Sequence, residues 1–153
     1  MSLADRMAVF MNGTLVQQGT PEEVFRRPAS VDVAAFLGNP PMNLLPARIE
    51  NGVAKLGTAS FAVPGLAPLG SRDIVLGIRP LDITIAERGV EATVTMREVL
   101  GDDVIVDFAV GDQLVRARSP AMRRLAEGER VQLHFDEAAL HVFDRESGLR
   151  VTR

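Results

Sequence analysis

Apolar and polar positions divide the chain into a short first part of mixed character and a longer part rich in strand patterns. The apolar run at 7–11 and the segment at 14–18 flank Asn12 and Gly13, a pair that favours a two-residue hairpin turn. The sequence therefore predicts a β-hairpin near the start of the chain.

A connector containing two short helices is expected from Gly19 to Asn43. Thr20 can cap the first helix, and Glu23 stands three residues after it, as a capping box requires. Pro28 ends this helix, because the residue before a proline is disfavoured in helical conformation.

The second helix of the connector is expected to start at the cap residue Ser30 and to stop at Gly38, a residue suited to the left-handed end of a helix. Its apolar face is predicted to comprise Val31, Ala34, Ala35 and Leu37.

Short apolar segments separated by turn residues make up the chain from residue 46 onward. The expected strands are 47–50, 53–56, 61–63, 74–79, 83–86, 91–100, 104–110, 113–118, 131–135 and 140–143. A loop is expected at 64–70, a bulge at Arg97-Glu98 and a short helix from Ser119 to about residue 127. Many short strands at this spacing predict a mainly β fold, a closed or nearly closed small barrel, with 46–90 and 91–145 as two similar strand groups.

Composition narrows the class of protein. A chain of 153 residues with 46% hydrophobic content can hold one packed domain, or one domain and part of another. The net charge of −3 gives no broad positive field for DNA or anionic lipid. The chain has no cysteine, which excludes disulfides and thiolate chemistry, and no apolar run approaches the ~20 residues of a membrane helix.

The sequence contains no motif of a common catalytic site. Lys55 is the only lysine and lacks the glycine spacing of a phosphate-binding loop, and neither a nucleophile elbow nor HExxH occurs. His134 and His141, with Asp136 and Asp144, are candidate metal ligands. Because zinc sites need three or four convergent ligands, ordinary strand positions are the favoured interpretation.

Two polar groups allow both structural and functional interpretations. Asp102 and Asp103 with Glu98 could bind a cation or act in acid–base chemistry, but aspartates at a turn commonly accept local N–H bonds, and this interpretation is favoured. Arg79 precedes Pro80 and is therefore extended. It can bind an acidic partner or form an ion pair that fixes the loop, and the sequence leaves both open.

An arginine-rich stretch is a candidate anion or nucleic-acid patch. Acidic residues interrupt it, and single-strand-binding barrels need exposed aromatic side chains, whereas the phenylalanines here stand at apolar strand positions. Nucleic-acid binding is therefore not expected. The arginines concerned are Arg116, Arg118, Arg123, Arg124 and Arg130.

Several longer motifs follow one another in a definite order. They are Leu3–Arg6 before the Asn12-Gly13 turn, Gly19–Phe25 with Pro28, Val33–Gly38, Pro41–Asn43, Gly77–Pro80, Glu98–Gly101 and His141–Asp144. This order covers essentially the whole chain and resembles the C-terminal part of the ATP-binding subunits of bacterial ABC importers of the carbohydrate-uptake type, which includes maltose and glycerol-phosphate systems.

The resemblance implies a fold and a division into domains. Residues 1–43 are expected to be the end of the ATPase domain and its connector, and 44–153 an OB-like accessory barrel of the TOBE type. The implied function is that of a regulatory and dimerisation domain in an importer of sugars or glycerol phosphate. A small-oxyanion-binding module, as in the related barrels of molybdate systems, is the alternative.

The resemblance also implies where catalysis lies. The phosphate-binding loop and catalytic motifs of the family would precede residue 1, so this chain is expected to be a fragment without ATPase activity. It is expected to need no cofactor of its own, while ATP and magnesium belong to the parent subunit. The expected location is cytoplasmic and peripheral to the inner membrane in the parent complex.

The partners implied are a second copy of the subunit, the membrane permease subunits through the ATPase domain, and a regulatory protein. The residues carried over as regulatory or dimer contacts are Gly77, Arg79, Pro80, Glu98, Gly101, Asp102, His141 and Asp144. No catalytic, cofactor-binding or metal site is expected.

The chain departs from the family pattern at Asp32 and Leu81. Asp32 replaces a usual aromatic residue and is expected to weaken the packing of the second connector helix, so Asp32→Phe should raise stability. Leu81 replaces a usual glutamate after Pro80, which removes a charged contact. Residues 1–18 are expected to be poorly ordered or to pair with another copy through their open edges.

Overall fold

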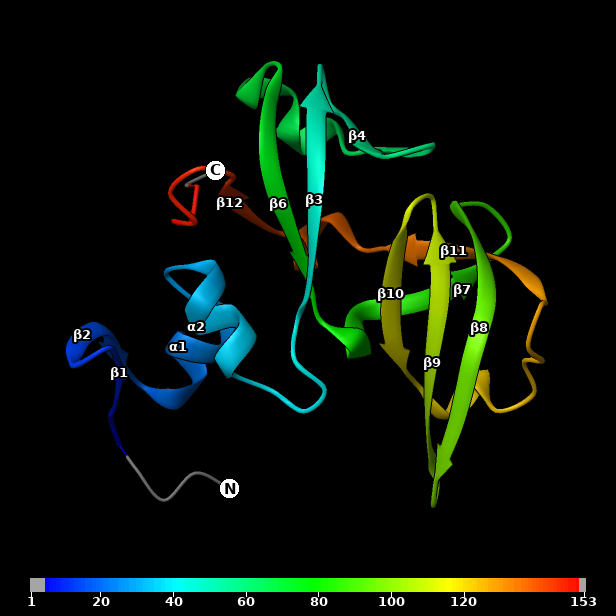
Figure 1. The fold of residues 1–153 in the computed structure, drawn as a ribbon, viewed down its shortest axis with the longest axis horizontal. Helices are drawn as coiled ribbons and strands as arrows, with labels where there is room; N and C mark the ends of the chain where they lie inside the picture. Colours follow the sequence, from blue (N-terminus) through cyan, green and yellow to red (C-terminus); the bar gives the residue numbers. More distant parts are fainter. Residues whose placement is uncertain (1–4, 152–153) are drawn as a thin grey trace.

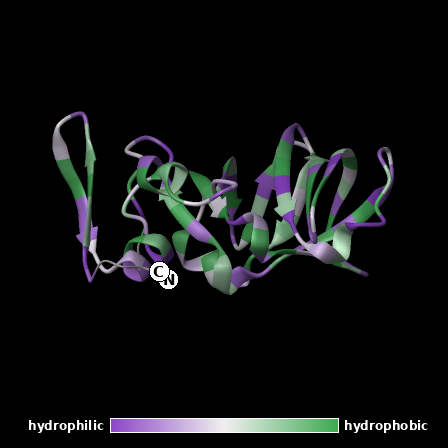
Figure 2. Ribbon diagram, turned by 90° about the horizontal axis from the view of Figure 1, so that it is seen from below, coloured by the Kyte–Doolittle hydropathy of each residue, from purple (hydrophilic) through white to green (hydrophobic). Residues whose placement is uncertain are grey.

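The computed structural model describes residues 5–151, and the chain is arranged as a row of three parts (Figure 1). A two-stranded hairpin lies at one end, two short helices follow, and two five-stranded antiparallel sheets form the rest. Figure 2 shows the hairpin standing apart from the remainder at the end of the elongated molecule.

The hairpin consists of β1 (Met7–Met11) and β2 (Thr14–Gly19), as predicted. Asn12 and Gly13 have φ of 50° and 75°, the backbone of a two-residue hairpin turn. The hairpin packs on the connector through Val9, which is buried with Val24 and Val33. The expectation that residues 1–18 are poorly ordered or pair with another copy stays a prediction, and residues 1–4 lie outside the described residues.

The connector helices are α1 (Pro21–Arg26) and α2 (Val31–Phe36). The capping box is confirmed, since the Glu23 N–H donates to the Thr20 hydroxyl and the Thr20 N–H donates to the Glu23 carboxylate. Ser30 caps α2 as predicted.

The predicted apolar face of α2 is wrong in part. Ala35 is exposed, whereas Val33 and Ala34 are buried against two different clusters. The helix lies between the hairpin and the sheets, so residues on two of its sides are covered. Asp32 is exposed, and the buried positions belong to its neighbours Val33 and Ala34, so the expected weakening of the packing stays a prediction.

One sheet has the strand order β12-β6-β3-β4-β5. Its strands are β3 (Asn43–Glu50), β4 (Val53–Leu56), β5 (Ala59–Ala62), β6 (Arg72–Ile78) and β12 (His141–Asp144). The expected loop at 64–70 is instead a 3-10 helix, Pro64–Leu69, whose Leu66 side chain is buried in the core.

The other sheet has the order β10-β9-β8-β11-β7. Its strands are β7 (Ile83–Ala86), β8 (Val90–Leu100), β9 (Asp103–Val110), β10 (Gln113–Arg118) and β11 (Arg130–Phe135). The bulge lies between Val94 and Met96 rather than at Arg97-Glu98. The expected helix from Ser119 is only a 3-10 turn, Pro120–Met122. Two further 3-10 turns, Pro80–Asp82 and Glu137–Ala139, were not predicted.

The mainly β, OB-like fold is confirmed, with two qualifications. The strands do not divide into the groups 46–90 and 91–145, because β7 pairs with β11 and β6 pairs with β12. The backbone ladder does not run on from one sheet to the other, although both sheets enclose one apolar core. Side-chain hydrogen bonds join them instead. The Asn43 amide donates to the Arg116 carbonyl oxygen and accepts from the Arg116 N–H, each at 2.8 Å, and the Gln113 amide donates to the Pro46 carbonyl oxygen at 2.7 Å.

Candidate functional site at the junction of connector and barrel

Arg79 fixes the connector to the barrel. It is the only buried charged or polar side chain among residues 5–151, with 7% exposure. Its Nη1 donates to the Leu37 carbonyl oxygen at 3.1 Å and its Nη2 to the Phe25 carbonyl oxygen at 2.5 Å. Both oxygens lie at helix C-termini, where unpaired carbonyl groups and the helix dipole favour a cation.

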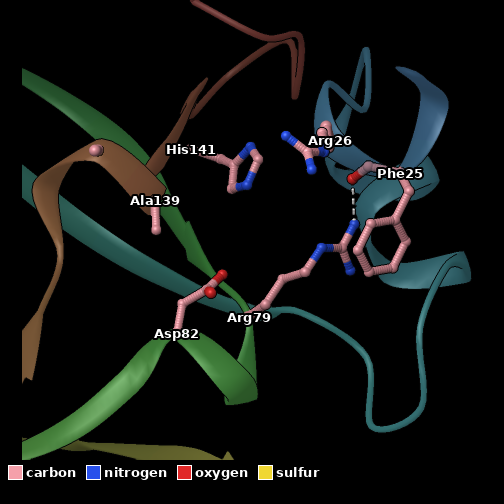
Figure 3. Close-up of a pocket in the computed structure, with 7 residues that line it drawn as sticks. Phe25, Arg26, Arg79, Asp82, Ala139 and His141 are labelled. Atoms are coloured by element: carbon pink, nitrogen blue, oxygen red, sulfur yellow. Dashed lines mark hydrogen bonds between the residues drawn. The ribbon is translucent and has the colours of Figure 1, made fainter. Parts of the chain in front are cut away.

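The aromatic ring of Phe25 completes this arrangement. The guanidinium carbon of Arg79 lies 3.4 Å from the ring centre, a cation–π contact (Figure 3). Burial lowers the pKa of Arg79 from its ordinary value, while the nearby Asp82 opposes this effect. Because an arginine stays protonated at any ordinary pH, the junction keeps a fixed positive charge.

Gly77 and Pro80 belong to the same junction. Gly77 lies on β6 opposite His141 of β12, and a Cβ there would stand 2.5 Å from the Met42 sulfur and 3.1 Å from the Phe143 ring. The absence of a side chain thus lets the connector's end and the last strand pack onto β6. Pro80 is buried and begins the turn that carries Asp82.

His141 lies at the edge of the junction on β12. Its ring stacks on Phe143 with centroids 6.5 Å apart. The Arg150 Nη2 atom is 2.7 Å from the imidazole Nδ1 atom. Since a guanidinium can only donate, Nδ1 accepts this bond and the proton of the neutral ring is on Nε2.

Asp144 ends the same strand and stabilises the chain that follows it. It accepts hydrogen bonds from the Ser147 and Glu146 N–H groups, and it pairs with Arg72 at 2.7 Å. These bonds, chiefly those from Ser147, lower the pKa of Asp144.

Two adjoining hollows open beside Arg79. One, of about 380 Å³, is lined by Phe25, Arg26, Arg79, Asp82, Ala138, Ala139 and His141. The other, of about 300 Å³, is lined by Arg26, Arg27, Ala138, Leu140, His141, Arg150 and Val151. We call the two together the arginine groove. Figure 3 shows Arg26 and His141 facing Arg79 and Asp82 across the first hollow.

Asp82 is the acidic group of the groove. Burial raises its pKa, an effect that Arg79 reduces and Asp136 increases. The fold therefore disfavours the ionised carboxylate at this position relative to water.

The structure brings together five of the eight residues carried over as contacts and separates the other three. Glu98, Gly101 and Asp102 lie at the end of the β8–β9 hairpin, in the other sheet (Figure 1). There Arg123 donates to the Gly101 carbonyl oxygen at 2.7 Å. Gly77, Arg79 and Pro80 are buried inside this chain, so any effect on a partner is indirect, and the contact role of all eight residues stays a prediction.

The structure also bears on the candidate metal ligands and on the arginine-rich stretch. The described part of the chain contains no group of three or more histidine, aspartate or glutamate side chains placed to hold a metal ion. Arg116 pairs with Asp107 and Arg118 with Asp103, so two members of the arginine-rich stretch are already in ion pairs.

Sequence reasoning missed the side chains that line the arginine groove from the connector. Arg26 and Arg27 follow Phe25 directly, and Asp82 follows Pro80 by two residues. Two arginines at the end of a short helix are visible in the sequence. That they lie beside β6 and β12 depends on the tertiary fold, which the sequence pattern does not show.

The fold and this junction define the class of protein: an OB-like accessory barrel preceded by a helical connector. Residues 76–143 match the TOBE domain family and residues 38–83 match the MalK OB fold domain family. Between them, residues 38–143 are similar to the TOBE and OB accessory region of ABC importer ATP-binding subunits.

Curated relatives support this assignment along the whole chain. The sn-glycerol-3-phosphate import ATP-binding protein UgpC of Cereibacter sphaeroides is 41% identical over 156 residues, which cover 99% of this chain and 44% of the relative. The proteins of the same name from Salmonella typhimurium and Escherichia coli O157:H7 are 40% and 39% identical, with the same coverage. The chain thus spans less than half the length of the relatives that it matches.

Proposed function

We propose that this chain is the regulatory and dimerisation region of the ATP-binding subunit of a bacterial importer for sugars or glycerol phosphate. The accessory-domain matches and the import ATP-binding relatives support this role. We further propose that residues 1–43 are the end of an ATPase domain with its connector, and that 44–153 are the accessory barrel.

The observation that carries the proposal is the attachment of the connector by Arg79. One guanidinium bonds the last turn of α1 and the end of α2 and stacks on Phe25. A connector held in this way moves with the barrel as one body. In the proposed mechanism, contact between two barrels persists while the ATPase halves open and close, and the rigid connector couples the two movements.

The end of the β8–β9 hairpin is the proposed contact between two copies. It projects beyond β10 (Figure 1) and joins Glu98, Gly101 and Asp102 to the exposed apolar residues Val99 and Leu100. Apolar side chains ringed by charge are typical of protein interfaces.

Sedimentation equilibrium tests this contact. The chain is expected to self-associate with concentration, and Leu100→Glu is expected to weaken the association at least about tenfold by burying a charge. Leu81→Glu is the matched control, since Leu81 is also exposed but belongs to the 3-10 turn Pro80–Asp82 and not to the β8–β9 hairpin. A monomer at all concentrations, or equal effects of both variants, would contradict the proposed contact.

We propose that the chain does not hydrolyse ATP by itself, that it needs no cofactor, and that ATP and magnesium act in the parent subunit. No helix within residues 5–151 combines the length and the apolar character needed to cross a membrane. Peripheral attachment to the inner membrane would come through permease subunits. Magnesium-dependent ATP turnover by the purified chain, surviving in Arg79→Lys, would overturn this assignment.

A further inference from the structure

We propose that Asn12, in the turn between β1 and β2, is a site of spontaneous covalent modification. Its side-chain amide is lost, and aspartate or isoaspartate takes its place. The reaction consumes only water, so it needs neither an enzyme nor a cofactor. The inference concerns the chemistry of this turn and does not depend on the importer role.

The reaction joins the asparagine side chain to the backbone of the next residue. The backbone nitrogen of Gly13 loses its proton and attacks Cγ of Asn12, and the new C–N bond closes a five-membered succinimide ring. The Cγ–Nδ2 bond breaks and ammonia leaves with the proton. Water then opens the ring at one of its two carbonyl groups. The sum of the steps exchanges one ammonia for one water, without oxidation or reduction.

The residue that follows an asparagine governs how easily the ring closes. The chain has four asparagines, and two of them, Asn12 and Asn51, precede a glycine, which has no side chain to hinder its nitrogen. Asn39 precedes a proline, whose nitrogen carries no proton. The Asn43 amide is held by its hydrogen bonds to Arg116. Only the two asparagine–glycine pairs therefore remain as candidates.

The turn at Asn12 is open to solvent and free of neighbours. Asn12 and Gly13 are both exposed, and the turn lies at the end of the hairpin that stands apart from the rest of the molecule (Figure 2). The strand pairing ends with Met11 and Thr14, so the Gly13 nitrogen lies outside the ladder. A Cβ atom placed on Gly13 would meet no atom of residues 5–151 within 4 Å, its chain neighbours apart. The peptide plane can rotate toward the geometry of attack without displacing another segment.

The turn at Asn51 has the same sequence and nearly the same backbone, with φ of 49° against 50° at Asn12, but it is packed. Gly52 is buried, and its carbonyl oxygen accepts a hydrogen bond from the Val63 N–H at 2.7 Å. A Cβ atom on Gly52 would stand 3.2 Å from the Cβ atom of Ala67, in the 3-10 helix after β5. Rotation at this turn therefore requires the 3-10 helix to move. Because the packing is what distinguishes the two turns, Asn12 is expected to react first.

The modification alters the hairpin that carries it. Isoaspartate adds a methylene group to the backbone and a negative charge, so the turn no longer has the two-residue geometry that matches the twist of its strands. The same hairpin holds Val9 against Val24 and Val33 of the connector. Loss of the side-chain amide at the turn is therefore expected to loosen the attachment of the hairpin.

Peptide mapping of the full chain, kept folded at mildly basic pH, tests the proposal. Trypsin cleaves after arginine and lysine, so Asn12 and Asn51 fall in separate peptides, 7–26 and 49–55. Mass spectrometry follows the gain of about 1 Da in each peptide, and chromatography separates isoaspartate from aspartate. Because Asn51 reacts only after local opening, the Asn12 peptide is expected to convert at least about tenfold faster.

The same chain unfolded in urea is the matched control, because neither turn then has packing around it. The two peptides are expected to convert at similar rates under that condition. Equal rates in the folded chain, or conversion of Asn12 in urea but not in the folded chain, would overturn the proposal.

Asn12→Asp separates the charge of the product from the lengthening of its backbone. Hydrogen exchange in residues 7–19 is expected to be faster in the chain that contains isoaspartate at position 12, and close to the original rate in Asn12→Asp. Equal exchange in these two proteins would contradict the expected effect on the hairpin.

Discussion

Arg79 lies 3.4 Å, measured from its guanidinium carbon, above the centre of the Phe25 ring, and it also donates a hydrogen bond to the Phe25 carbonyl oxygen. The two residues are 54 positions apart in the sequence. A single side chain of the barrel thus holds the ring and the backbone of one connector residue at the same time, which makes this pair the mechanical link between the two parts.

Replacing Arg79 by lysine is expected to destabilise the chain by about 2 kcal/mol, because one ammonium group cannot stack on the ring and bond both carbonyl oxygens. Urea unfolding measures the loss, and hydrogen exchange should show faster exchange in residues 20–37. Arg124→Lys, on an exposed site, is the control. A loss below about 0.5 kcal/mol, the usual surface effect, would show that the contact does not hold the connector.

Gly77→Ala is expected to cost about 1–3 kcal/mol through overpacking between Met42 and Phe143. Because the nearest atom is the Met42 sulfur, the double variant Gly77→Ala/Met42→Ala should lose less than the sum of the single losses. Thermal unfolding of the four proteins in this cycle measures the coupling. Strict additivity would mean that the methyl group fits without meeting Met42.

Asp32→Phe is expected to lower stability by about 0.3–1 kcal/mol, opposite to the expectation from the sequence. Asp32 lies exposed in the first turn of α2, where a negative charge favours the helix dipole. Asp32→Asn removes the charge without adding an aromatic ring, and it should account for most of the loss of stability. A rise in the free energy of unfolding for Asp32→Phe would restore the family-based expectation of aromatic packing.

Asp144 is expected to contribute to acid unfolding. Hydrogen bonds from Ser147 and the Arg72 guanidinium lower its pKa from 3.8, so its stabilisation is present above 3.8 and is lost as the pH falls through the lower folded value. Unfolding free energies of the chain and of Asp144→Asn are therefore expected to converge in that acid range. A constant difference between them at every pH would contradict the linkage.

Asp82 is expected to have the opposite effect on the pH dependence of stability. Burial raises its pKa above 3.8, so ionisation disfavours the folded state, and this cost disappears as the pH falls through the raised value. Asp82→Asn should therefore stabilise the chain at neutral pH and lose that advantage in acid. Comparison of the two proteins by urea unfolding at pH values on both sides of the transition checks the sign.

Local rules were sufficient for most elements of the fold. The turn residues Asn12 and Gly13, and the cap pair Thr20 and Glu23, act within a few positions of themselves, so the hairpin and α1 were predicted from the sequence. The strand expected at 104–110 is confirmed as β9, in which the alternate apolar residues Val104, Val106 and Phe108 are buried.

The remaining features depend on contacts between distant segments. Ala35 was assigned to the covered face of α2, but the helix is covered on two sides by clusters whose members come from β1 and β12. Asn43 follows a proline-rich stretch and carries no visible signal, yet it supplies two of the hydrogen bonds that join the sheets. The groove likewise combines Arg26 with His141, which no local pattern relates.

The last described residues close the chain onto its own connector. The Arg150 N–H donates to the Ala29 carbonyl oxygen, its Nε donates to the Pro28 carbonyl oxygen, and the Val31 N–H donates to the Gly148 carbonyl oxygen. During synthesis the ribosome delivers these partners more than a hundred residues after the connector. These backbone bonds can therefore form only after residue 150 has been made, whereas the contacts of Arg79 with the connector can form earlier.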